Sequence, residues 1–121
     1  ERGKLNDLIS LYPEYSNEIN AIICRLKDLM LPFQKKWYYT PEMRGSHSIK
    51  AVLPALVPSL SYNNLDIKDG GSASTIFMQM VNGTYDGDYE KTKTDLLAYC
   101  KLDTWAMVEI LNRLKELKMI F

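Results

Sequence analysis

The clearest pattern of hydrophobic and polar positions lies in the last third of the chain. Mainly apolar residues recur there at steps of three and four along the chain. This spacing places them on one stripe of a predicted α-helix from about Tyr89 to Lys118. The stripe consists of Leu96, Tyr99, Asp103, Ala106, Ile110, Leu114 and Leu117. Six of these residues suit a core, but Asp103 does not, because a buried carboxylate is costly unless a partner compensates it. Tyr99, one turn earlier, puts a phenol on the same face.

Two further helices are predicted at the start of the chain. Residues 1–11 and 14–26 each carry apolar residues at helical spacing, and Pro13 separates them. Proline is tolerated in a first turn, so it can end the first helix and begin the second. Residues 27–32 resemble a short extended segment that ends at a proline. Residues 33–44 predict an aromatic and basic loop.

The middle of the chain predicts two more helices, separated by turns. The first runs from Ile49 to about Val57 and must accommodate Pro54. The second follows the glycines of residues 69–71, with Ser72 or Ser74 as its N-terminal cap. The expected fold class is therefore α+β but predominantly helical, with little strand and no complete sheet. Residues 1–121 are expected to form one domain or a fragment of one.

Composition excludes several classes of protein without choosing among the rest. The 121 residues are 46% hydrophobic and 25% charged, and 15 basic residues balance 15 acidic ones. A net charge of zero gives the chain no overall electrostatic attraction to nucleic acid or to acidic membranes. The sequence contains no apolar run long enough to span a membrane and no leader pattern. Cys24 and Cys100 are expected to be buried thiols of a cytoplasmic protein.

Several segments together resemble a bacterial family of unknown function. They are Gly45 to Pro58 (GSHSIKAVLPALVP), Leu60 to Tyr62, Asp69 to Ser74 and Leu96 to Thr104. That family is similar to a branch of the DEDDy-type 3′–5′ exonucleases, which have an RNase H-like fold. The resemblance implies that this chain is the C-terminal part of such a domain.

The resemblance also implies roles for individual residues. The third motif of DEDDy enzymes is Tyr-x-x-x-Asp, which Tyr99 and Asp103 match. Tyr99 would position the attacking water, and Asp103 would bind one of two Mg²⁺ or Mn²⁺ ions, which favour oxygen ligands. Glu1 resembles the acid of the second motif, although the usual residue there is aspartate. The Asp-x-Glu of the first motif has no counterpart and would lie upstream.

Each candidate residue has a plainer interpretation. Asp103 could cap or pair with a nearby lysine or arginine, with Tyr99 serving as a core residue. A second candidate site combines Lys35, Lys36 and Trp37 with Arg44 and Lys50, since aromatics can stack on bases while basic groups contact phosphates. The same residues would also suit an exposed loop that its aromatics pin to the core.

The predicted function is that of a fragment of a metal-dependent 3′–5′ exonuclease-like domain. Because one or two carboxylates hold two metal ions poorly, the fragment is expected to be inactive alone. The alternatives are a non-catalytic helical module that binds nucleic acid or protein within a larger nuclease, and a structural domain. Expected partners are DNA or RNA, the upstream part of the same parent protein and a second copy of the chain, with no membrane.

Overall fold

The computed structural model describes residues 2–118, and every regular element in that range is helical. The expected predominantly helical fold without a complete sheet is confirmed. No helix within the described range combines the length and the apolar character needed to cross a lipid bilayer.

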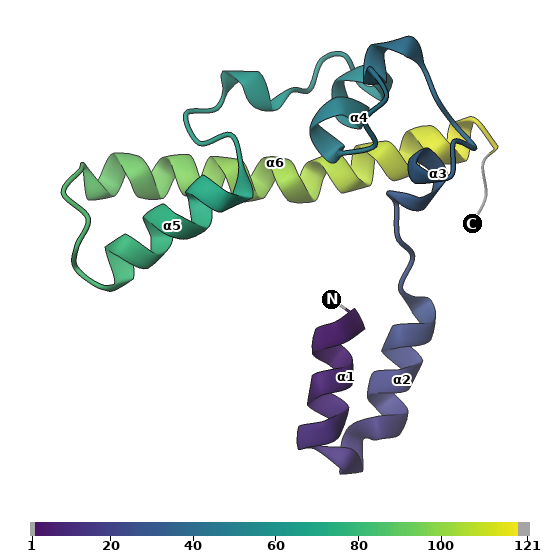
Figure 1. Cartoon of the computed structure of the whole chain (residues 1–121), viewed down its shortest axis with the longest axis horizontal. Helices are drawn as coiled ribbons and strands as arrows, with labels where there is room; N and C mark the ends of the chain where they lie inside the picture. Colours follow the sequence, from purple (N-terminus) through teal and green to yellow (C-terminus); the bar gives the residue numbers. More distant parts are fainter. Residues whose placement is uncertain (1, 119–121) are drawn as a thin grey trace.

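Helix α6, Tyr89–Glu116, is the longest element, and the others are arranged along it (Figure 1). Its 28 residues correspond to about 42 Å at the usual rise per residue. The Asp88 carboxylate accepts a hydrogen bond of 3.0 Å from the Lys91 backbone N–H, which caps the first turn. The sequence pattern therefore located this helix correctly, to within two residues at its end.

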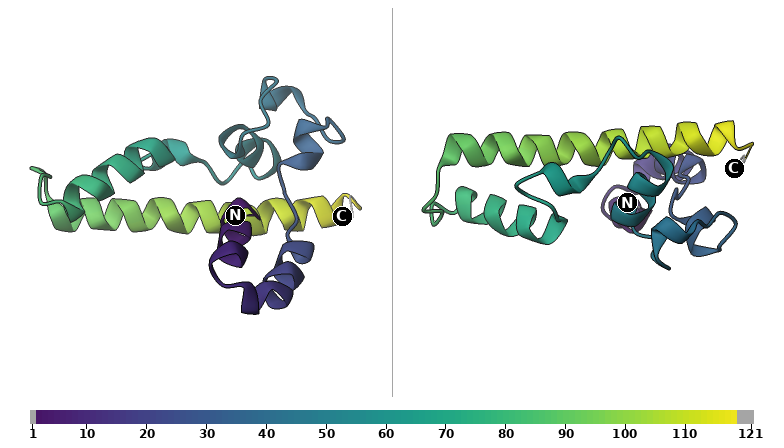
Figure 2. Two further views of the ribbon diagram at one scale, coloured as in Figure 1. Left: turned by 60° about the horizontal axis from the view of Figure 1, so that its bottom comes forward. Right: turned by 90° about the horizontal axis from the view of Figure 1, so that it is seen from above.

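Helix α5, Gly70–Val81, runs beside the first half of α6 in every view (Figures 1 and 2). Its cap is Asp69, whose carboxylate accepts hydrogen bonds from the Ser72 backbone N–H at 2.9 Å and from the Ser72 hydroxyl at 2.8 Å. The predicted cap, Ser72 or Ser74, was therefore wrong by a few residues. Ser72 takes part in the cap as a donor, and the two glycines begin the helix.

Helix α4, Ile49–Leu56, covers the second half of α6 and forms most of the core with it. The Arg113 Nε donates to the carbonyl oxygen of Leu56 at 3.2 Å, so a side chain of α6 satisfies a carbonyl at the end of α4. The buried hydrophobic residues are Phe33, Met43, Val52, Leu53, Leu56, Tyr62, Ile67, Tyr99, Ala106, Ile110 and Leu114.

Two short helical turns lead into α4. Helix α3, Leu31–Gln34, places Pro32 in its first turn, and a 3₁₀ turn, η2, covers Pro41–Met43. The extended segment predicted for residues 27–32 was thus only partly correct, because proline at this position begins a helix instead of ending a strand. Phe33 and Met43 from these turns are buried in the core.

The first two helices form a hairpin that we call the N-terminal hairpin. It consists of α1, Arg2–Leu11, the 3₁₀ turn η1, Pro13–Tyr15, and α2, Ser16–Arg25. The helices lie side by side, away from α6 (Figure 1). Their half-buried apolar residues are Leu5, Ile9, Ile19 and Ile23, and neither α1 nor α2 contains a buried residue. The hairpin therefore adds nothing to the core of the remaining chain.

The predicted stripe of α6 is largely correct. Tyr99, Ala106, Ile110 and Leu114 are buried, and Leu96 and Asp103 are half-buried. Leu117 is 49% exposed, because the helix ends beyond the packed region. The expectation of two buried thiols was wrong, since Cys24 and Cys100 are both exposed.

Candidate functional site

Tyr99 and Asp103 face the middle of the molecule and meet a third residue there. Tyr62, from the 3₁₀ turn η3, Tyr62–Asn64, donates its hydroxyl to Asp103 Oδ1 at 2.5 Å. The Tyr62 and Tyr99 ring centroids lie 6.0 Å apart with the planes tilted by 54°. Two phenols and one carboxylate thus form a single cluster, contributed by α6 and by the connection between α4 and α5.

Local structure holds Tyr62 in place. The Ser61 hydroxyl accepts a hydrogen bond from the Asn63 backbone N–H at 3.1 Å, which fixes the start of η3. Tyr62 itself is 4% exposed, and Ile67 further along the same connection is also buried. The Tyr62 side chain is therefore anchored at both ends, by packing around the ring and by Asp103 at the hydroxyl.

The electrostatics of the cluster favour neutral phenols. Burial raises the pKa of the Tyr62 hydroxyl well above its usual range, and the hydrogen bond to the Asp103 carboxylate and its charge raise it further. Burial also raises the pKa of Tyr99, with a smaller contribution from the charge of Asp103. Both hydroxyls therefore remain protonated at neutral pH and are available as hydrogen-bond donors.

The compensation that Asp103 requires comes from a phenol. Within the described residues, no lysine or arginine forms an ion pair with Asp103. The pairing with a basic residue, which is the plainer interpretation of Asp103, is therefore not what the structure shows. Sequence reasoning missed Tyr62, which it placed in an ordinary turn. The two residues lie 41 positions apart, and periodicity links only residues within one helix.

The cluster lies at one end of a groove between α5 and α6, which we call the α5–α6 groove. Its volume is about 690 Å³. The lining residues are Gly70, Ala73, Ser74, Phe77, Met80 and Val81 from α5, and Tyr89, Lys93, Leu96, Leu97, Tyr99, Cys100 and Asp103 from α6. Lys93 and Asp103 are its only charged lining residues in the described part of the chain, so most of the groove is apolar.

The described residues do not by themselves fit a site for two metal ions. Within residues 2–118, no three acidic, histidine or cysteine side chains lie close enough to hold an ion together. Asp69 lies near Tyr99, but both of its carboxylate oxygens already cap α5. Glu1, the other predicted metal ligand, lies outside the described residues. Asp103 can therefore supply one carboxylate, and further ligands must come from elsewhere.

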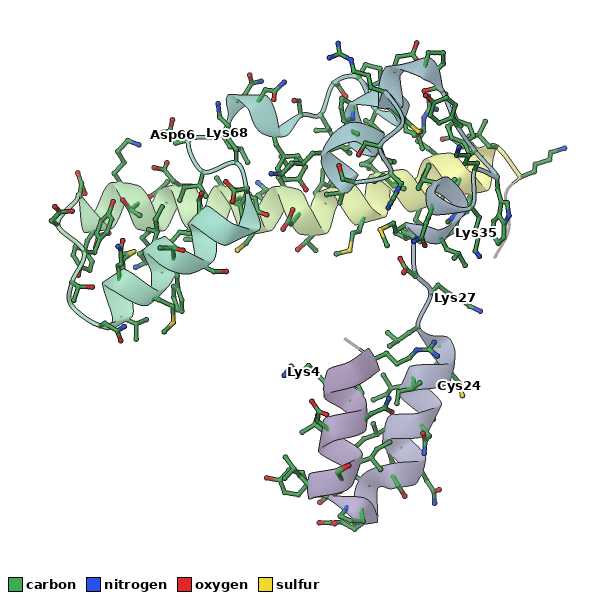
Figure 3. All side chains as sticks on the ribbon, in the orientation of Figure 1. Lys4, Cys24, Lys27, Lys35, Asp66 and Lys68 are labelled. Atoms are coloured by element: carbon green, nitrogen blue, oxygen red, sulfur yellow. The ribbon has the colours of Figure 1, made fainter. Side chains whose placement is uncertain are left out.

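The predicted nucleic-acid-binding residues fall into two groups. Lys35, Lys36 and Trp37 directly follow α3, and Trp37 is 61% exposed. Lys35 lies near the last turns of α6 (Figure 3). The Gly45 backbone N–H donates to the Tyr39 hydroxyl at 3.2 Å, which folds the segment containing Arg44 back on itself. All four side chains are exposed in one continuous segment of chain.

Lys50 belongs to a different part of the surface. It is an exposed residue of α4. Hydrogen bonds from the Ser72 backbone and hydroxyl lower the pKa of Asp69, and the charge of Lys50 lowers it slightly further. Lys50 is therefore close enough to the N-terminal cap of α5 for its charge to act on Asp69, and it does not belong to the segment of residues 35–44.

Comparison with known proteins gives one result. A family model described as a domain of unknown function (DUF2779) matches residues 1–48. No curated protein and no solved structure matches the chain. The matched range contains the N-terminal hairpin, α3 and η2, whereas Tyr62, Tyr99 and Asp103 lie beyond it. The similarity to a domain of unknown function is thus supported, and the exonuclease resemblance receives no support from these comparisons.

Proposed function

We propose that the chain is part of a metal-dependent 3′–5′ exonuclease-like domain, to which it contributes Tyr99 and Asp103. One observation carries the proposal: a protonated phenol and a half-buried carboxylate stand one turn apart on α6, at the end of an open groove. A carboxylate with one apolar side and one open side is suited to binding a cation that enters from the groove.

Tyr62 supports this role by orienting the carboxylate. Its hydroxyl engages Asp103 Oδ1, which restrains the carboxylate and leaves Oδ2 to face Tyr99 or another partner. Groups that hydrogen-bond a metal ligand commonly set its orientation and its affinity for the ion. We therefore assign Tyr62 as a positioning residue, Asp103 as a metal ligand and Tyr99 as the group that positions water.

The same observations limit what the chain does alone. Asp103 is a single carboxylate, and two-metal hydrolysis of phosphodiesters requires several. The remaining ligands would come from Glu1 and from an upstream segment of the parent protein. We accordingly expect the 121-residue chain by itself to bind Mg²⁺ or Mn²⁺ weakly and to be inactive on DNA and RNA.

The proposal is tested in a longer polypeptide that includes the sequence preceding this chain. Labelled single-stranded DNA and RNA are incubated with it, with and without Mg²⁺ or Mn²⁺. Asp103→Asn and Tyr99→Phe should each lower the rate of end degradation by about 10²-fold or more. Asp95→Asn is the matched control, because Asp95 is an acid of the same helix that instead pairs with Lys91 at 2.8 Å.

Equal activity of the parent polypeptide and its Asp103→Asn variant would exclude Asp103 from the mechanism. Absence of activity combined with tight binding of the labelled strands would favour a second function, a non-catalytic module that binds nucleic acid. The exposed segment of Lys35, Lys36, Trp37 and Arg44 favours that alternative, because it joins cationic groups to an accessible aromatic ring.

A further inference from the structure

Two apolar surfaces of the chain lack a covering in this structure. In the α5–α6 groove, Phe77 is 56%, Val81 63% and Leu97 63% exposed. On the N-terminal hairpin, Leu11 is 70% and Tyr15 57% exposed. Apolar side chains gathered on a surface to this extent commonly mark a site of association with another polypeptide.

The charges of the two surfaces are complementary. The open end of the hairpin carries the basic residues Arg2, Lys4 and Arg25, and Lys27 follows on the connecting segment (Figure 3). Lys4 also forms an exposed ion pair with Asp7 at 3.9 Å. The tip of the hairpin carries the exposed acids Glu14 and Glu18. The groove has a cation, Lys93, at one end and an anion, Asp103, at the other.

The lengths of the surfaces also correspond. Helix α1 has 10 residues, which is about 15 Å at the usual rise, and α2 is equally long. Lys93 and Asp103 are separated by about the same distance along α6. A hairpin laid along the groove with its tip at Lys93 would therefore bring its basic end to Asp103.

We propose that the α5–α6 groove receives the N-terminal hairpin of a second copy of this chain. In the proposed dimer, Glu14 and Glu18 of each copy lie beside Lys93 of the other. The basic end lies beside Asp103, so the hairpin and a metal ion compete for that carboxylate. Because the proposed exchange is reciprocal, with each hairpin in the groove of the other copy, it closes as a two-fold dimer. The hairpin stands away from α6, so its outer surface is accessible to a second copy (Figure 1).

Sedimentation equilibrium of the 121-residue chain tests the dimer directly. A dimer is expected at micromolar concentration, and Phe77→Asp should weaken it at least tenfold, since a charge replaces an apolar groove residue. Trp105→Asp is the matched control, because Trp105 is 51% exposed on α6 but does not line the groove. A monomeric wild-type chain, or a Phe77→Asp variant that dimerises normally, would overturn the proposal.

The two native cysteines identify the surfaces that meet. Cys24 lies near the open end of the hairpin, Cys100 lines the groove one turn before Asp103, and both are exposed (Figure 3). In a mixture of Cys24→Ser and Cys100→Ser chains, any link that a short bifunctional maleimide forms between Cys24 and Cys100 must join two different chains. The expected product is that cross-linked heterodimer. If wild-type chains instead acquire only an internal Cys24–Cys100 link, the hairpin occupies its own groove and the proposal is wrong.

Discussion

Asp103 illustrates how one residue connects the stability of this chain with its proposed function. Its carboxylate lies half-buried on a helix stripe whose other members include Tyr99, Ala106 and Ile110. The Tyr62 hydroxyl compensates part of the cost of that burial with a charge-assisted hydrogen bond. The uncharged partner leaves the negative charge of Asp103 in place, which a bound cation would require.

Replacement of Tyr62 by phenylalanine should measure this bond. The variant retains the buried ring but leaves Asp103 Oδ1 without its donor, so the free energy of unfolding should fall by about 1.5–3 kcal/mol. Urea denaturation at pH 7 provides the measurement. Combining the change with Asp103→Asn completes a double-mutant cycle, and additive effects of the two substitutions would show that the hydroxyl and the carboxylate do not interact.

The Tyr62–Asp103 pair should also make the free energy of unfolding fall in alkaline solution. The pKa of Tyr62 is raised in the folded chain, so between the unfolded value near 10 and the folded value the native state holds more protons than the unfolded state. The contribution is therefore fully present below pH 10 and is lost as the pH rises further. Tyr62→Phe should reduce the slope of stability against pH above 10, and an unchanged slope would assign it to other groups.

At this scale the sequence predicted only half of the cluster. Tyr99 and Asp103 lie one turn apart in a regular helix, so their common face follows from the geometry of the helix alone. Tyr62 is positioned by a connection whose path depends on where α4 and α5 pack, and that packing is a tertiary property. The predicted roles of Tyr99, Asp103, Glu1 and the basic residues stay predictions.

Among the elements outside the N-terminal hairpin, the two longest helices, α5 and α6, each begin at an aspartate cap. Asp88 caps α6 through Lys91, and Asp69 caps α5 through Ser72. The start of α5 adjoins the candidate site, because a Cβ added at Gly70 would be in ordinary van der Waals contact with the Tyr99 hydroxyl at 3.5 Å. The first turn of α5, which Asp69 caps, and the cluster are therefore neighbours.

Asp69→Ala should test the importance of that cap. Loss of the hydrogen bonds to Ser72 should lower the midpoint of urea denaturation, because two donors at the start of α5 lose their acceptor. The pKa of Asp69 is lowered in the folded chain, so the difference should be present above pH 4 and shrink as the pH falls. Ser74→Ala is the control at the cap position that the sequence suggested, and a larger loss there would contradict the assignment.

The helices were predictable where periodicity, proline and turn residues agreed. Residues 2–11, 49–56 and 89–116 all form helices close to their predicted limits. Prediction failed at Pro32, where the same residue type can end a strand or begin a helix, and at the start of α5, where Asp69 competed with two serines as the cap. In both places the outcome depends on the path of the neighbouring chain.

The whole molecule consists of a helical body along α6 and a hairpin attached through one short segment. The buried hydrophobic residues come from α3, η2, α4, the connection between α4 and α5, and α6, and none comes from α1 or α2. Figure 3 shows Lys27 on the connecting segment, with its side chain directed outward. The unit that the family model matches, residues 1–48, thus spans both parts, whereas the candidate cluster belongs to the body.

Limited trypsin digestion should separate these two parts. Cleavage after Lys27 is expected first, because residues 26–30 contain no helix and Lys27 is exposed. The fragment from residue 28 onward should keep cooperative thermal unfolding, as judged by circular dichroism, since it retains the core. Lys27→Gln should slow this cut, and loss of cooperative unfolding in the fragment would show that the hairpin contributes to the core.

The bond between Tyr62 and Asp103 also has a consequence for the order of folding. It joins residues 41 positions apart, whereas the helices and their caps depend on neighbours within a few residues. Contacts between distant residues form only after the intervening chain has lost much of its freedom. The helices should thus appear early in refolding, and the environment of Tyr62 should become native in the slowest phase. The cluster that the proposed function depends on would then be among the last features of the molecule to form.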